Sequence, residues 1–124
     1  MQYERIFKAL SDKTRLRILY VLLKAGKALC ICEIMDALQL AHYNISRHMK
    51  DLKVTGLVNE KRVGKFIFYA LDDSGNRFIK DIIKAVDSIP GNDFRDDMGR
   101  LKKRLSLRED NKCVIGILKN GISK

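Results

Sequence analysis

Residues 30–56, "CICEIMDALQLAHYNISRHMKDLKVTG", form the stretch that decides the fold. Apolar residues recur every three or four positions in both of its halves, which predicts helices over residues 30–38 and 42–55. The segment "QLAHYN" between them makes a tight connection, and Gly56 is a good stop for the second helix. Two helices joined by so short a turn have the size and spacing of a helix-turn-helix.

A change of period beyond the second helix indicates a β-hairpin. Residues alternate with a period of two in "LVNEKR" (57–62) and in "KFIFYAL" (65–71), as they do in strands. Gly64 stands between the two runs, where a tight turn favours a residue that tolerates positive φ. The tip of the expected hairpin carries two cations, Arg62 and Lys65.

Further helices are expected on both sides of this central unit. Helical spacing predicts them over residues 3–10, 13–24 and 72–89, and a sixth helix of the chain that begins at a capping residue, Asn92. The resulting order is helix, helix, helix-turn-helix, hairpin, helix. It predicts a winged helix-turn-helix, a mainly α fold with a β-hairpin as its wing.

Pro90 is the only proline of the chain and the clearest boundary in the sequence. We divide the chain there into a winged DNA-binding and dimerisation unit over residues 1–90 and a C-terminal helix and tail over residues 91–124. The sequence does not indicate a role for residues 107–124.

The charge balance points to a polyanionic partner. The chain has 25 Lys and Arg residues against 15 Asp and Glu, a formal net charge of +10 on 124 residues. An excess of this size attracts polyanions, with nucleic acid as the first candidate. The longest apolar run, "ILYVLL" (18–23), is far short of a membrane span, and the N-terminus has no signal-peptide core. We therefore expect no membrane partner and a cytoplasmic location.

The second helix of the helix-turn-helix is expected to read double-stranded DNA. A helix fits the major groove, where base edges present distinct patterns, and a basic hairpin beside it reaches the backbone or the adjacent minor groove. Arginine and lysine bind phosphates, while asparagine pairs with adenine. The candidate contacts are His42, Asn44, Ser46, Arg47, His48 and Lys50 on the helix, and Arg62 and Lys65 on the hairpin.

Two other classes of function fit the sequence less well than DNA binding. The sequence has no recognisable nucleophile–base pair and no Gly-rich phosphate loop, so we expect neither an enzyme nor an organic cofactor. A winged-helix module that binds protein in place of an operator is the other alternative. A recognition helix without Arg and Asn would favour that module, but this one carries Arg47 and Asn44.

Three stretches of the sequence carry a resemblance to a known family. They are "KALSDKTRLRILYVL" (8–22), "LCICEIMDALQLAHYNISRHMKDLKVTGLV" (29–58) and "KRVGKFIFYAL" (61–71). Together they resemble the ArsR/SmtB family of small metal-sensing transcriptional repressors, and "LCIC" resembles its arsenic- and cadmium-type members. The resemblance implies operator binding in the apo state and release when an effector binds.

A homodimer is implied by the same resemblance, built largely from the first and fifth helices. The apolar pattern supports it independently, because stripes on Ile6, Phe7 and Leu10 and on Ile79 and Ile83 are hard to cover in so small a chain. The alternative is that the sixth helix covers the fifth within one chain.

Cys30 and Cys32 stand one residue apart at the expected start of the third helix. On an ideal helix such side chains point about 200° apart, so chelation by both sulfurs is expected to distort the first turn and thereby shift the recognition helix. The free N–H groups of a helix start favour thiolates, which are soft ligands that select thiophilic ions. In the resembled family a Cys-x-Cys at this position binds trivalent arsenic or antimony, cadmium, lead or zinc. We expect such an effector, arsenite first.

Two other interpretations of this pair stay open. Free cysteine is often simply buried, and thiols near a helix start with Cys113 as a resolving partner would suffice for a redox switch. Cys113 is also the candidate third metal ligand, because Met35 stands where many arsenic repressors of the resembled family supply a thiol. The fifth helix contains no histidine, so the family's second, zinc-binding site is not expected.

Overall fold

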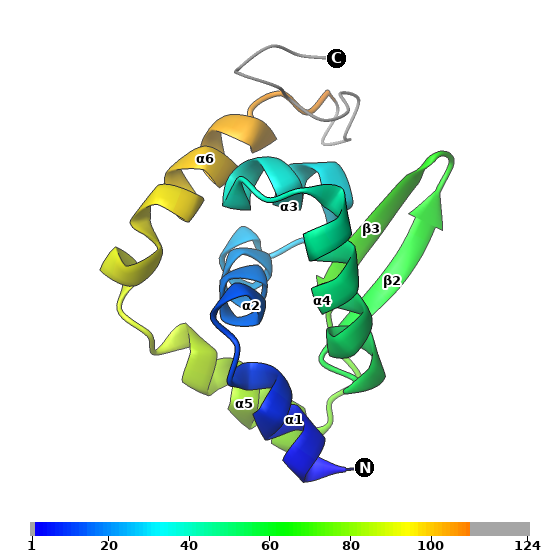
Figure 1. Cartoon of the computed structure of the whole chain (residues 1–124), viewed down its shortest axis with the longest axis vertical. Coiled ribbons are helices and arrows are strands. Elements are labelled where there is room, and N and C mark those ends of the chain that lie inside the picture. Colours follow the sequence, from blue (N-terminus) through cyan, green and yellow to red (C-terminus); the bar gives the residue numbers. More distant parts are fainter. Residues whose placement is uncertain (1, 110–124) are drawn as a thin grey trace.

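The computed structural model describes residues 2–109, which fold into six α-helices, a 3-10 turn and three β-strands (Figure 1). In chain order these elements are α1 (Tyr3–Leu10), α2 (Lys13–Ala25), β1 (Leu29–Cys30), α3 (Ile31–Leu38), α4 (His42–Val54), β2 (Val58–Val63), β3 (Phe66–Leu71), α5 (Arg77–Asp87), η1 (Gly91–Phe94) and α6 (Arg95–Leu105). The winged helix-turn-helix is therefore confirmed, with α3 and α4 as its two helices and β2–β3 as its wing. Among the described residues no helix combines the length and apolar character needed to cross a membrane.

Helix α2 runs through the middle of the fold, with the other helices arranged around it (Figure 1). It begins where the Asp12 carboxylate accepts a hydrogen bond from the Arg15 backbone N–H (3.0 Å) and ends at Gly26, which adopts a φ of 65°. Ile18 and Val21 are completely buried on this helix. The same core includes Ile34 and Leu38 of α3, Ile45, Met49 and Leu52 of α4, and Phe94 and Leu101 from the C-terminal part.

The sheet has one strand more than the sequence predicted. Its order is β1-β3-β2, with β3 antiparallel to both neighbours. The hairpin closes between Val63 and Phe66, and Gly64 adopts a φ of 60° in the two-residue turn. Strand β1 pairs Cys30 with Phe68, so it attaches the start of α3 directly to the wing.

Helix α5 begins later than expected. The predicted start at Asp72 is wrong, because Asp72 accepts hydrogen bonds from the backbone N–H (3.3 Å) and hydroxyl (2.8 Å) of Ser74, and Gly75 adopts a φ of 89°. These local bonds compete with helix formation. The helix starts only after Asn76, whose side chain accepts from the Ile79 N–H (3.0 Å).

The C-terminal helix also differs from the prediction. Asn92 does not cap it, because a 3-10 turn over Gly91–Phe94 intervenes and the Asn92 side chain accepts from Arg95 Nη2 (2.8 Å). Helix α6 then packs along α3, at the end of the molecule opposite α1 and α5 (Figure 1). The interpretation in which this helix covers α5 is therefore wrong.

An aromatic cluster joins α1 to α5. The rings of Tyr3 and Phe7 meet the Phe78 ring edge to face, with centroids 4.8 and 5.8 Å apart. Tyr3 is nevertheless 51% exposed and Phe7 57% exposed. Helix α1 thus presents two large aromatic side chains on the surface of the described chain, beside the half-buried Phe78 of α5.

Candidate functional site

The cysteine pair lies where β1 passes into α3. Cys30 is the last residue of the strand and the N-cap of the helix, with extended backbone angles (φ −67°, ψ 147°), while Cys32 lies in the first helical turn. The predicted helix start at Cys30 is therefore wrong by one residue. This difference matters because an extended residue and a helical residue do not follow the 200° rule of a continuous helix.

The two sulfurs meet without any distortion of the helix. Cys30 Sγ and Cys32 Sγ lie 2.9 Å apart in hydrogen-bond contact, and both residues are free cysteines. The expectation that the first turn must unwind before both sulfurs can face one ligand is consequently wrong. Both cysteines are buried, and the partly buried Phe66 and Phe68 of the wing pack against them.

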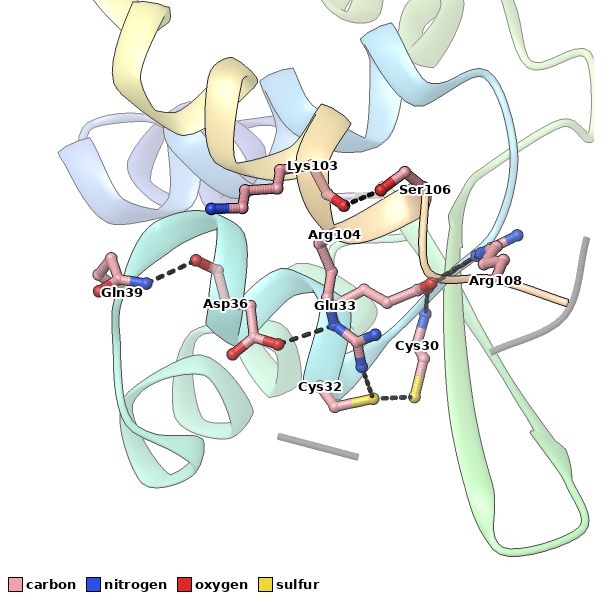
Figure 2. A network of polar contacts seen from close by, with 9 residues as sticks. All are labelled: Cys30, Cys32, Glu33, Asp36, Gln39, Lys103, Arg104, Ser106 and Arg108. Atoms are coloured by element: carbon pink, nitrogen blue, oxygen red, sulfur yellow. Dashed lines mark hydrogen bonds and ion pairs between the residues drawn. The ribbon is translucent and has the colours of Figure 1, made fainter. Parts of the chain in front are cut away.

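Glu33 fixes the backbone of this turn. Its side chain is fully buried and accepts a hydrogen bond from the Cys30 backbone N–H (2.8 Å), as the third helical residue does in a capping box. Its carboxylate also receives two hydrogen bonds of 2.6 Å from the guanidinium of Arg108, which in turn donates to the Ala28 carbonyl (2.9 Å). The start of α3 is thus tied to the segment that follows α6 (Figure 2).

Arg104 of α6 reaches the sulfur of Cys32. Its side chain is 1% exposed, with Nε 2.7 Å from the Asp36 carboxylate and Nη2 3.5 Å from Cys32 Sγ. Figure 2 shows the guanidinium between the Asp36 carboxylate and the Cys32 sulfur. The chemistry of this site therefore combines two thiols with a buried cation that is paired with a carboxylate.

The two thiols can supply two of the ligands of a thiolate metal site. Metal–sulfur bonds of about 2.3 Å in a tetrahedral site place two sulfurs about 3.8 Å apart, so the pair has to open by about 1 Å. Within residues 2–109 no cluster of three or more Cys, His, Asp or Glu side chains is arranged to hold a metal ion. Met35 packs in the main core, and Cys113 lies outside the described residues.

Half of the DNA contacts predicted on α4 are exposed to solvent. His42, Arg47 and Lys50 are exposed on α4, whereas Asn44 and Ser46 are half-buried. Tyr43 is 73% exposed, and the Arg47 guanidinium lies over its ring at 5.9 Å. This arrangement leaves a polar and basic face available on the second helix of the helix-turn-helix.

His48 lies differently from the other predicted contacts. Its side chain is buried, and Nδ1 lies 3.2 Å from Arg15 Nη1 and 3.9 Å from the Asp12 carboxylate. A guanidinium only donates hydrogen bonds, so Nδ1 acts as the acceptor. Since Arg15 also donates to Asp51 (3.2 Å), these contacts fix α4 against α2. We therefore treat His48 as a positioning residue.

The wing carries the remaining predicted contacts. Arg62, at the end of β2, and Lys65, in the turn, are both exposed. The wing is also fixed to the recognition helix, because Lys53 Nζ lies 3.0 Å from the Glu60 carboxylate. This hydrogen bond from Lys53 holds the pKa of Glu60 below its ordinary value.

The sequence interpretation missed the charged side chains around the cysteines. Two patterns contained the signal. Glu33 and Asp36 interrupt an otherwise apolar helix, and Arg100, Arg104 and Arg108 recur every four residues in the C-terminal part of the chain. Acidic residues on a buried face require partners, and a cationic stripe of helical period is one way to supply them.

Comparison with known proteins places the chain in a family. The model of the bacterial regulatory protein, arsR family, matches residues 12–60, which include the helix-turn-helix. The arsenic resistance transcriptional regulator ArsR2 of Pseudomonas putida is 31% identical over 97 residues, covering 78% of this chain and 84% of that protein. The chain belongs to the ArsR family.

Other ArsR-family proteins agree in sequence and in structure. A Staphylococcus aureus protein described as a cadmium resistance transcriptional regulatory protein CadC homolog is 38% identical over 73 residues, covering 59% of this chain. The chain spans about three fifths of that relative's length (60%). The cadmium metal-sensor CmtR of Mycobacterium tuberculosis superposes with a TM-score of 0.54 at 30% identity, covering 71% of this chain and 86% of the sensor.

Proposed function

We propose that this ArsR-family chain is a transcriptional repressor that binds a double-stranded DNA operator. The exposed side chains of α4 and the cations of the wing support this proposal, because they suit a helix in the major groove with a hairpin on the backbone. The formal net charge of +10 adds a general attraction to DNA. The proposed contacts are His42, Asn44, Ser46, Arg47, Lys50, Arg62 and Lys65.

The effector in this proposal is a thiophilic metal or metalloid that binds Cys30 and Cys32. The observation that carries it is the 2.9 Å approach of the two sulfurs at the start of α3. Arsenite is the first candidate and cadmium, lead or zinc the others, since two relatives are described as arsenic and cadmium resistance regulators. Cys113 is the proposed third ligand.

The location of the pair suggests how binding would release DNA. Cys30 is paired with Phe68 of the wing, and Cys32 belongs to the first helix of the helix-turn-helix. Two sulfurs that open to accept an ion push against Phe66 and Phe68, which pack on them. The wing is fixed to α4, the proposed recognition helix, through Lys53 and Glu60, so displacement of the wing would also move α4.

A homodimer is part of the same proposal. The exposed aromatic side chains of α1, beside Phe78 of α5, are the surface that a second copy would cover. A twofold dimer presents two recognition helices to two half-sites of a palindromic operator.

A titration of the DNA complex tests the function. A duplex selected from a random library is labelled, and its release from the protein is followed by fluorescence anisotropy as arsenite, cadmium, lead or zinc is added. We expect release from the wild-type protein at stoichiometric ion. Replacing both cysteines (Cys30→Ser with Cys32→Ser) should preserve DNA binding and abolish release.

Matched variants separate the possible outcomes of this titration. Cys113→Ser should weaken the response if the tail supplies the third ligand, and leave it unchanged if two sulfurs suffice. A double-serine variant that still responds would show that the sensor lies elsewhere. If no duplex is enriched from the library, the chain is better regarded as a winged-helix module that binds protein.

The same sulfur contact favours a second candidate, a thiol redox switch. Two thiols in contact form a disulfide by losing two protons and two electrons, and a peroxide that accepts them is reduced to water. Hydrogen peroxide is therefore a further arm of the titration. Release by peroxide that a dithiol reductant reverses, without release by any ion, would support the redox switch over the metal sensor.

A further inference from the structure

Three arginines, spaced four residues apart in the sequence, contact successive parts of α3. Arg100 Nε donates to the Ala37 carbonyl (2.7 Å) at the end of α3, whereas Arg108 pairs with Glu33 at its start. Arg104 lies between them, paired with Asp36. Arg100 and Arg104 lie four residues apart on one face of α6, which runs antiparallel to α3, and Arg108 follows the end of this helix at Leu105.

Arg104 differs from Arg100 because it reaches a sulfur. A buried guanidinium requires a compensating charge, and the Asp36 carboxylate supplies it at 2.7 Å from Arg104 Nε. Arg104 Nη2 donates to Cys32 Sγ (3.5 Å), a contact that the ion pair with Asp36 does not itself require. The planar fork of arginine thus joins a carboxylate and a thiol of the same helix from outside that helix (Figure 2).

We infer that Arg104 is a positioning residue of the cysteine site. Its guanidinium donates to Cys32 Sγ and holds this sulfur facing Cys30, where both act on one thiophilic ion. The inference rests on the metal-sensing function proposed above. Partners that orient a metal ligand are typically worth about 10- to 100-fold in metal affinity, which is the effect expected of Arg104.

The structure supplies a matched control for this residue. Arg100 lies one turn away on the same face of α6, and its contacts are with the Ala37 carbonyl and Asp97. Loss of Arg100 therefore weakens the docking of α6 on α3 without removing a hydrogen bond to a sulfur. A role of Arg104 that is only structural would make the two arginines equivalent in metal binding.

The test is a direct titration of the full chain with cadmium chloride, followed by the ultraviolet thiolate-to-metal absorption in competition with a chelator. We expect Arg104→Gln to bind cadmium about 10- to 100-fold more weakly than wild type, and Arg100→Gln to bind within about twofold of it. Arg104→Lys keeps the positive charge but loses the planar guanidinium that contacts both Asp36 and Cys32, so this variant should also bind cadmium more weakly. Affinity for DNA without metal should be similar in all of them.

A double variant protects the test against misfolding. Arg104→Gln leaves the Asp36 carboxylate buried without this partner, whereas Arg104→Gln with Asp36→Asn removes both charges together. A folded double variant with weakened cadmium binding supports the inference. If the folded double variant and Arg104→Lys both bind cadmium with wild-type affinity, the inference about Arg104 is wrong while the metal-sensing function stands. If cadmium does not bind the cysteines of the wild-type protein, both the metal-sensing function and this inference are wrong.

Discussion

At the scale of single residues, Tyr69 shows how the wing is held to the body of the protein. It lies in the central strand β3, opposite Leu29 of β1 and Glu60 of β2, and it is 5% exposed. Burial, together with the nearby Glu60 carboxylate, raises the pKa of Tyr69 from 10.0 to about 12. The neutral phenol is therefore the form that the folded protein prefers.

This shift predicts a loss of stability in alkali. The phenol ionises near pH 10 in the unfolded chain and near pH 12 in the folded protein, so the unfolded chain gives up its proton first. Stability from this group is complete below about pH 10 and falls as the pH rises towards 12. Chemical denaturation at several pH values should show this fall in the wild-type protein and a shallower one in Tyr69→Phe.

A second variant assigns the cause. Burial is the largest contribution to the shift and the Glu60 carboxylate a smaller one, so Glu60→Gln should lower the pKa of Tyr69 only partly, and the phenolate absorbance should report it. An alkaline fall of the same size in wild type and in Tyr69→Phe would show that other groups cause it.

At the scale of elements, the wing is the part whose role in DNA binding is easiest to isolate. Arg62 and Lys65 are exposed at its tip, so replacing them leaves the core unaffected. If each cation neutralises one phosphate, Arg62→Gln and Lys65→Gln should each reduce the slope of log affinity against log salt by about 1. Affinity for the selected duplex, measured over a series of salt concentrations, gives the slope.

Lys103 provides the control for this measurement. It is an exposed lysine on α6, outside the helix-turn-helix and the wing, so Lys103→Gln removes the same charge from a different place. Its slope should equal that of the wild type. Equal slopes for the wing variants and wild type would mean that the wing does not contact phosphates.

The elements also show which parts of the fold the sequence determines locally. Helical spacing was sufficient to predict α2 and α4, and alternation with Gly64 was sufficient to predict the hairpin, because each signal lies within the element it defines. Strand β1 has only two residues and exists because β3 pairs with it, which no local pattern of residues 29–30 reveals. The sulfur contact depends on that strand, since it makes Cys30 extended.

The charged part of the cysteine site was unpredictable for a similar reason. The pairs Asp36–Arg104 and Glu33–Arg108 join residues about 70 positions apart, and they form only because α6 packs on α3. Local sequence reasoning identified the two thiols as a candidate site. It did not identify α6 as the helix that supplies a cation to these thiols, because arginines at helical spacing are equally typical of a solvent-exposed helix face.

At the scale of the whole molecule, the cysteine site and the apolar surface lie at opposite ends of the described chain. Helix α6 and the start of α3 occupy one end, and α1 with α5 the other (Figure 1). Because α6 packs on α3, it leaves the aromatic side chains of α1 exposed. The proposed effector site and the proposed dimer surface are therefore separate, so each can be mutated without altering the other.

A single substitution on α1 tests the dimer. Phe7 is 57% exposed and lies at the edge of the Phe78 ring, so Phe7→Asp costs the monomer little packing and places a charge on the proposed interface. Sedimentation at micromolar concentrations should show a dimer for wild type and a monomer for Phe7→Asp, with unchanged helical circular dichroism. Val63→Asp, at a residue 51% exposed on the wing, is the control and should remain dimeric. A monomer binds the two half-sites independently, so Phe7→Asp should also weaken operator binding. Its metal affinity should stay that of the wild type. A wild-type protein that is itself monomeric would contradict the assignment of this surface to a dimer interface.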